Sequence, residues 1–138
     1  AARNNMVVPG TSVQIGLRTH NPDTHGFNVI SASQVHESES QEIAAEIKRV
    51  VGDTLVYLTF DIDCLDPSIA PGTGTPVVGG LSAHQAITIL RGLKGINLVG
   101  MDVVEVAPAY DVSEITALAA ATIALNQLCV FASRGVAR

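Results

Sequence analysis

Aromatic side chains are scarce in this sequence: it has no tryptophan, and aromatic residues make up 4% of the chain. An aromatic core is thereby excluded, so the core must be built from aliphatic side chains. Charged residues are also few, at 15%, whereas hydrophobic residues reach 47%. Because disordered chains lack the apolar surface that offsets ordering entropy, we expect a folded protein.

The sequence also lacks a surplus of positive charge, cysteine motifs and targeting signals. The formal net charge is −5 and no Lys/Arg cluster occurs, which argues against a nucleic-acid partner. Cys64 and Cys129 follow no zinc or redox spacing, so two reduced thiols are expected. No signal peptide is recognisable, and no apolar run reads as long enough to span a membrane. These absences predict a cytoplasmic protein without a membrane partner.

Strand and helix patterns alternate along the 138 residues, without a repeat or a domain boundary. Strands are predicted over 13–18, 28–31, 55–62 and 97–106, and helices over about 40–51, 83–93 and 111–131. Ser82 is placed to cap the second helix, and Asp111 with Glu114 has the form of a capping box for the third. The strands at 55–62 and 97–106 are nearly continuously apolar, as in parallel strands buried on both faces. The order predicts an α/β fold, a parallel sheet covered by helices.

Two aspartates end the strand at 55–62. Asp61 and Asp63 are two residues apart, a spacing that places both side chains on one face of a strand. They lie at the carboxyl end, where open α/β sheets bind ligands. One carboxylate would take up a proton unless a cation such as Mg²⁺ or Mn²⁺ neutralised the pair. The alternative is a pair of turn-forming aspartates, and Asp66 is expected to bond the backbone rather than a metal.

A second acidic site ends the strand at 97–106. Asp102 and Glu105 face opposite sides of an ideal strand, and Glu105 lies nearer its carboxyl end. Glu105 is therefore the better functional candidate, whereas Asp102 is expected to make a structural hydrogen bond or ion pair. Four histidines lack the spacing of metal ligands and are expected to be surface or capping residues: His20, His25, His36 and His84.

These acidic segments resemble a known family. Residues 60–67 (FDIDCLDP), 70–76 (APGTGTP) and 79–81 (GGL) are similar to a signature of the arginase and agmatinase ureohydrolases. Residues 99–111 (VGMDVVEVAPAYD) resemble the next segment, in its bacterial agmatinase version. The resemblance implies a three-layer α/β/α fold around a mainly parallel sheet, a binuclear Mn²⁺ centre, and a trimer or hexamer. It also implies hydrolysis of a guanidinium substrate, with agmatine giving urea and putrescine.

The resemblance also assigns roles. Asp61 would bridge both metal ions, Asp63 would bind one, and Glu105 would bind the substrate guanidinium and position its reacting carbon. The family's remaining ligands, an upstream histidine and an Asp-x-His-x-Asp segment, are absent from this sequence. Residues 1–138, which start without methionine, are thus expected to be the C-terminal portion of one ureohydrolase domain. Without the missing N-terminal half, the chain is expected to be inactive, with an exposed sheet edge.

Two alternatives stay open on the sequence alone. Aspartate-nucleophile phosphatases also use Asp-x-Asp after an apolar strand, with Mg²⁺, but they usually continue with Gly-Thr, where this chain has Cys64 and Leu65. The second alternative is that the chain is a non-catalytic module, that is, an inactive homologue or a fragment that serves folding or oligomerisation.

Overall fold

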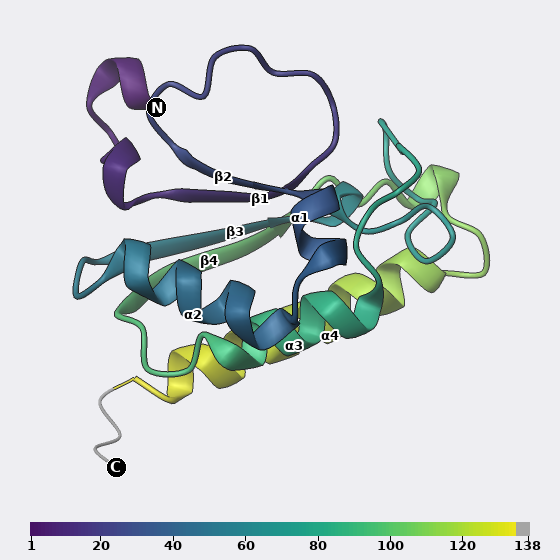
Figure 1. Cartoon of the computed structure of the whole chain (residues 1–138). Helices are drawn as coiled ribbons and strands as arrows, with labels where there is room; N and C mark the ends of the chain where they lie inside the picture. The colour runs from purple at the N-terminus through teal and green to yellow at the C-terminus, as the bar shows by residue number, and fades with distance from the viewer. Residues whose placement is uncertain (135–138) are drawn as a thin grey trace.

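Strands and helices alternate along the chain in the computed structural model, which describes residues 1–134 (Figure 1). The strands are β1 (Val13–Leu17), β2 (Asn28–Ser31), β3 (Val56–Asp61) and β4 (Leu98–Val104). The α-helices are α1 (Ala32–Glu37), α2 (Ser40–Val51), α3 (Ala83–Gly92) and α4 (Ile115–Ala132). The strands, α2 and α3 confirm the sequence prediction within two residues at either end, whereas α1 was not predicted.

The strands form two parallel pairs. β1 pairs with β2, and β3 pairs with β4 from Val56–Leu98 to Asp61–Val104. No strand pairing joins β1 to β3 within residues 1–134, so each of these strands keeps an edge without a strand partner. Helices α2, α3 and α4 all lie on one side of the β3–β4 pair (Figure 1). The α/β class and the parallel direction of the strands are confirmed, while the strands form two separate pairs rather than one sheet.

Side-chain caps explain where two of the helices begin. The hydroxyl of Ser82 accepts a hydrogen bond from the Gln85 amide at 3.1 Å, and the Gln85 side chain accepts one from the Ser82 amide at 3.0 Å. This capping box confirms the start predicted for α3. Ser31 and Gln34 form the same box at the start of α1, at 3.2 and 2.8 Å. The sequence therefore contained a signal for the start of α1, namely Ser31 followed three residues later by Gln34.

The start predicted for α4 was wrong. The helix begins only at Ile115, because Ser113 and Glu114 have positive φ angles of 55° and 59° and turn the chain first. Asp111 and Glu114 therefore form no capping box. Asp111 still stabilises the helix end, since its carboxylate accepts hydrogen bonds from two amides of the first turn, that of Thr116 at 2.9 Å among them.

Helix α4 is also more apolar than the sequence reading allowed. Its 18 residues have a mean hydropathy of 1.8, long and apolar enough to cross a membrane by length and composition, so the expectation that no run reaches this length was wrong. Core helices of soluble proteins pass the same test. Here α4 buries Ile123 and Val130 at 2% and 3% exposure. The side-chain amide of Gln127 donates to the carbonyl of Asp102 in β4 at 2.9 Å, which ties α4 to that strand.

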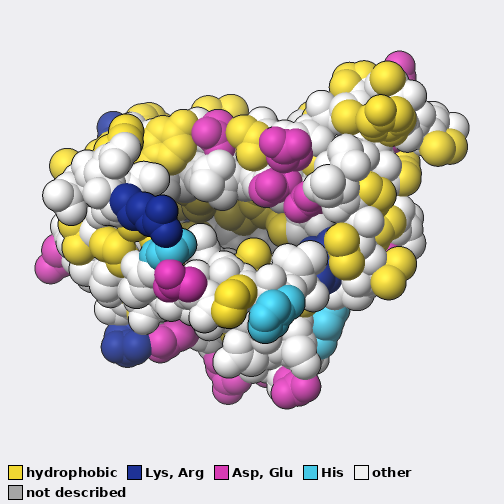
Figure 2. Space-filling model, turned by 90° about the horizontal axis from the view of Figure 1, so that it is seen from above, with side chains coloured by type: hydrophobic (Ala, Val, Ile, Leu, Met, Phe, Trp, Pro, Cys, Tyr) yellow, Lys and Arg dark blue, Asp and Glu magenta, His cyan; other side chains and the backbone are white. Residues whose placement is uncertain are grey.

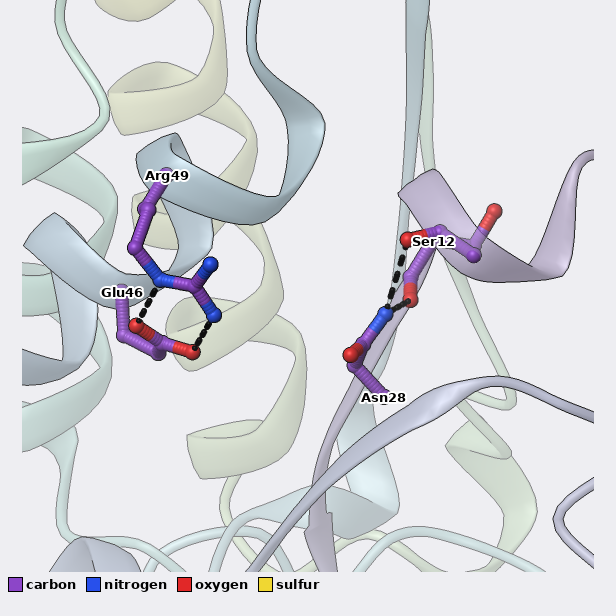
Figure 3. A network of polar contacts seen from close by, with 5 residues as sticks. Ser12, Asn28, Glu46 and Arg49 are labelled. Atoms are coloured by element: carbon purple, nitrogen blue, oxygen red, sulfur yellow. Dashed lines mark hydrogen bonds and ion pairs between the residues drawn. The ribbon is translucent and has the colours of Figure 1, made fainter.

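Figure 3 shows two examples of polar contacts outside the core. The side-chain amide of Asn28 donates to the carbonyls of Gly10 and Ser12, both at 3.1 Å, and thereby holds the start of β2 to the segment before β1. On α2, the Arg49 guanidinium pairs with Glu46 at 2.6 and 2.7 Å, and both side chains are exposed. Exposed pairs of this kind contribute little to stability.

Gly80 packs directly on main-chain atoms. A Cβ added to Gly80 would lie 2.5 Å from the carbonyl carbon of Leu65 and 2.6 Å from the amide nitrogen of Asp66. Because backbone atoms cannot swing aside, Gly80→Ala is expected to lower the free energy of unfolding by about 1–3 kcal/mol, measured by denaturant unfolding. Gly74→Ala is the matched control, since no atom lies within 4 Å of a Cβ there. Equal stability of the two variants would contradict this packing.

Candidate active site

Asp61 and Asp63 lie side by side at the carboxyl end of β3. Asp61 is the last strand residue, and Asp63 lies in the 3-10 turn Ile62–Cys64 that follows. The prediction that Asp63 continues the strand was therefore wrong, because β3 ends at Asp61. Ile62 between them is fully buried, whereas both aspartates are half-buried, and Oδ1 of Asp61 accepts a hydrogen bond from the Asp63 amide at 3.1 Å. The turn thus keeps the two carboxylates together.

Negative charge gathers at this point. Burial raises the pKa of Asp61, and the charges of Asp63 and Glu105 raise it further, against the lowering effect of the Asp63 amide. Within residues 1–134, no lysine or arginine forms an ion pair with these three carboxylates. Figure 2 shows acidic side chains gathered along one side of a hollow in the surface. An arrangement of this kind suits a bound cation.

Glu105 follows β4 in an unusual backbone conformation. Its φ angle is 66°, in the left-handed region that few residues other than glycine adopt, and its side chain is exposed. Such strain is found at functional sites, where the surrounding structure holds it in place. Since β4 ends at Val104, strand alternation does not decide where Glu105 points. The carboxylate of Asp102 accepts a hydrogen bond from the Tyr57 hydroxyl at 2.9 Å, which confirms the structural hydrogen bond predicted for it.

Thr75 is a site residue that the sequence reasoning missed. Its hydroxyl donates a hydrogen bond to Oδ2 of Asp63 at 2.8 Å, from the Gly/Pro-rich loop that follows the carboxylates. Such a contact orients one carboxylate oxygen and leaves the other free. The only signal in the sequence was the position of Thr75 in a long loop, which predicts function for the loop but not for one residue.

Comparison with known proteins identifies the family. The family model for the arginase family matches residues 1–129. The chain belongs to the arginase family. It is 58% identical over 134 residues to the agmatinase of Escherichia coli O1:K1 / APEC. This match covers 97% of this chain and 44% of that protein.

Solved structures of arginase-family relatives share the fold. A hypothetical agmatinase from Burkholderia thailandensis is 56% identical, with a TM-score of 0.92 over 94% of this chain and 41% of that one. The proclavaminate amidino hydrolase of Streptomyces clavuligerus is 38% identical, with a TM-score of 0.91. The match covers 95% of this chain and 45% of that one. The family resemblance and the α/β fold are thereby confirmed. The chain spans less than half the length of these relatives.

Asp66 of this arginase-family chain bonds the backbone, as predicted. Its carboxylate accepts hydrogen bonds from the amides of Ser68 at 3.0 Å, Gly79 at 2.8 Å and Gly80 at 3.3 Å. Hydrogen bonds from Ser68, and then those from Gly79 and Gly80, lower the pKa of Asp66 to about 2. Asp66 therefore closes the loop that carries Thr75 by holding both of its ends.

The low pKa of Asp66 makes loop stability depend on pH. The ionised carboxylate stabilises the fold above its ordinary pKa of 3.8, and this contribution is lost as the pH falls towards about 2. Asp66→Asn is expected to lower the melting temperature at about pH 7, and the difference from wild type should shrink at about pH 3. Asp53→Asn, an exposed aspartate at the other end of β3, is the control. A difference that grows on acidification would contradict this role.

The histidines and cysteines do not complete a metal site. All four histidines are exposed, and His25 pairs with Asp23 at 2.9 Å, away from the carboxylates in the sequence. Burial raises the pKa of the Cys64 thiol to about 12, so it stays protonated at neutral pH. No group of three or more His, Cys, Asp or Glu side chains within residues 1–134 could hold a metal ion. An ion bound by Asp61 and Asp63 would need further ligands.

Proposed function

We propose that this chain is the C-terminal portion of a manganese-dependent ureohydrolase that hydrolyses agmatine to putrescine and urea. The observation that carries the proposal is the set of three carboxylates at the carboxyl ends of β3 and β4, Asp61, Asp63 and Glu105, with which no lysine or arginine of residues 1–134 forms an ion pair. Membership of the arginase family and 58% identity to an agmatinase support the reaction and the substrate.

The donor set fits a hard divalent ion. Carboxylate oxygens are preferred ligands of Mn²⁺ and Mg²⁺, and a divalent charge relieves the repulsion that raises the pKa of Asp61. In the proposal, Asp61 would be a ligand shared by two Mn²⁺ ions and Asp63 would be a ligand of one of them. When bound, such ions activate water for attack on an electrophilic carbon.

The side chains of this chain contribute binding and orientation. Thr75 fixes one oxygen of Asp63, which would leave the other oxygen available to a metal ion. Glu105 accepts paired hydrogen bonds from the planar guanidinium of the substrate and holds its carbon in line for attack. The left-handed backbone at Glu105 supports this role, because backbone strain of this kind is concentrated at functional sites.

We propose that the rest of the site comes from the remainder of a longer protein, called the complete enzyme below. Two aspartates cannot hold two metal ions tightly, and the chain spans 44% of the related agmatinase. Within residues 1–134, β1 and β3 each keep an edge without a strand partner, which offers a position for a further strand. Exposed apolar side chains on α4 (Ile115, Leu118, Leu125 and Leu128) support contacts with other parts of the enzyme or with further subunits of a homo-oligomer.

Metal titration with a urea assay tests the function. The complete enzyme, stripped of metal, is expected to release urea and putrescine in equal amounts from agmatine only after Mn²⁺ is added. Arginine, which carries an additional carboxylate at the far end, is expected to react more slowly. Absence of both Mn²⁺ binding and urea release would contradict the proposal and favour a non-catalytic module.

A further inference from the structure

Arg18, the residue after β1, connects the segments that surround the carboxylates. Its guanidinium nitrogen Nη2 lies 2.6 Å from the carbonyl oxygen of Asp63 and 2.6 Å from that of Val77, and Nε lies 2.9 Å from the Val77 oxygen. Longer contacts of 3.4 Å reach the carbonyls of Leu65 and Gly16. No carboxylate forms an ion pair with this half-buried guanidinium in the part of the chain that the structure describes. All its hydrogen bonds go to the main chain.

These contacts restrain Asp63 from two directions. One nitrogen of Arg18 holds the main chain of Asp63, and the same nitrogen holds Val77, two residues beyond Thr75. The Thr75 hydroxyl in turn donates to the Asp63 carboxylate at 2.8 Å. Arg18 therefore sets the distance between the turn that carries Asp63 and the loop that orients it.

The backbone of β1 is adapted to direct Arg18 towards the turn that follows β3. The pairing register shifts between Ile15 and Leu17, and Gly16 between them has a φ angle of 82°. A bulge of this kind redirects the side chains that follow it. A Cβ on Gly16 would lie 3.0 Å from Cδ1 of Leu81, so both the backbone angle and the space favour glycine here. Arg18 thereby links two strand pairs that share no backbone pairing in residues 1–134.

We propose that Arg18 is a positioning residue for the metal centre, an inference that rests on the proposed function. By fixing the Asp63 turn to the Thr75 loop, Arg18 presents the Asp63 carboxylate to one of the two metal ions. Asp61, the last residue of β3, is also held by strand pairing with Val104, so despite its hydrogen bond from the Asp63 amide it depends less on this link than Asp63 does. Loss of Arg18 should therefore weaken one metal site much more than the other.

An arginine suits this task better than a lysine. The planar guanidinium carries five donors in a fixed fork and can bond several carbonyls at once. A lysine keeps the charge but concentrates its donors on one flexible ammonium group. Arg18→Lys is thus expected to retain part of the restraint, and Arg18→Ala none of it.

Stepwise titration of the metal-free complete enzyme with Mn²⁺, followed by electron paramagnetic resonance, tests the proposal. Arg18→Ala is expected to weaken one of the two Mn²⁺ sites by about 10–100-fold and to leave the other near its wild-type affinity. Arg18→Lys should fall between Arg18→Ala and wild type. Arg49→Ala, which removes the surface pair with Glu46 (Figure 3), is the matched control and should bind both ions as wild type does.

Three results would overturn the role of Arg18. The first is wild-type affinity at both sites in a folded Arg18→Ala protein. The second is equal weakening at both sites together with a lower melting temperature of the metal-free protein, which would indicate a general structural role. If Arg18→Ala does not fold, the same two outcomes are measured on Arg18→Lys. The third is a wild-type enzyme that binds no Mn²⁺, which would refute the proposed function and the Arg18 role with it.

Discussion

Replacing Asp61 by asparagine in the complete enzyme is expected to abolish urea release from agmatine and to lower the manganese content. Asparagine keeps an oxygen that can accept the hydrogen bond from the Asp63 amide, but it removes the charge that we propose bridges the two ions. If the transition state loses several kcal/mol of charge stabilisation, the rate falls by about a thousandfold or more. Urea release under saturating agmatine and metal analysis of the purified variant measure the two effects.

The metal-free stability of the same variant separates a functional role from a structural one. Because the pKa of Asp61 is raised in the folded protein, its ionised form disfavours the fold at neutral pH. The metal-free Asp61→Asn protein is therefore expected to be at least as stable as metal-free wild type. Asp53→Asn, with an exposed aspartate before β3, should change neither activity nor metal content. Normal turnover by Asp61→Asn would remove this residue from the metal centre.

Replacing Glu105 by glutamine is expected to lower kcat/KM for agmatine by about a hundredfold or more while the manganese content stays unchanged. The neutral amide cannot form the charge-assisted fork with a guanidinium, and a lost interaction of this kind costs about 2–5 kcal/mol when buried by substrate. Steady-state kinetics together with metal analysis distinguish this result from loss of the metal centre.

Glu114→Gln is the matched control for Glu105. Both are exposed glutamates in the left-handed backbone region, with φ angles of 66° and 59°, but Glu114 lies at the start of α4. The control should leave kcat/KM unchanged. Kinetics of Glu105→Gln that match those of the control would exclude Glu105 from substrate binding.

Local patterns in the sequence were sufficient to predict most elements of this fold. Continuous apolar runs predicted β3 and β4, and the Ser82 cap predicted the start of α3. The start of α4 was predicted wrongly because Asp111 caps the helix from beyond a turn with positive φ angles. Neither the turn nor the separation of the strands into two pairs has a local signature, because each depends on contacts between distant segments.

The candidate site was predictable only in part, for the same reason. Acidic residues at two strand ends predicted Asp61, Asp63 and Glu105 as site candidates, since parallel strands bring their carboxyl ends together. Arg18 and Thr75 were missed, because their contacts with Asp63 span 45 and 12 residues. A half-buried arginine that bonds only carbonyls and a threonine in a glycine-rich loop look ordinary in a sequence.

Anomalous scattering at the manganese absorption edge, from crystals of the complete enzyme, tests the central claim most directly. Our account predicts two manganese peaks, with the Asp61 carboxylate between them and Asp63 bound to one. A map without such peaks, in which lysine, arginine or main-chain amides bind the carboxylates of both Asp61 and Asp63, would contradict it.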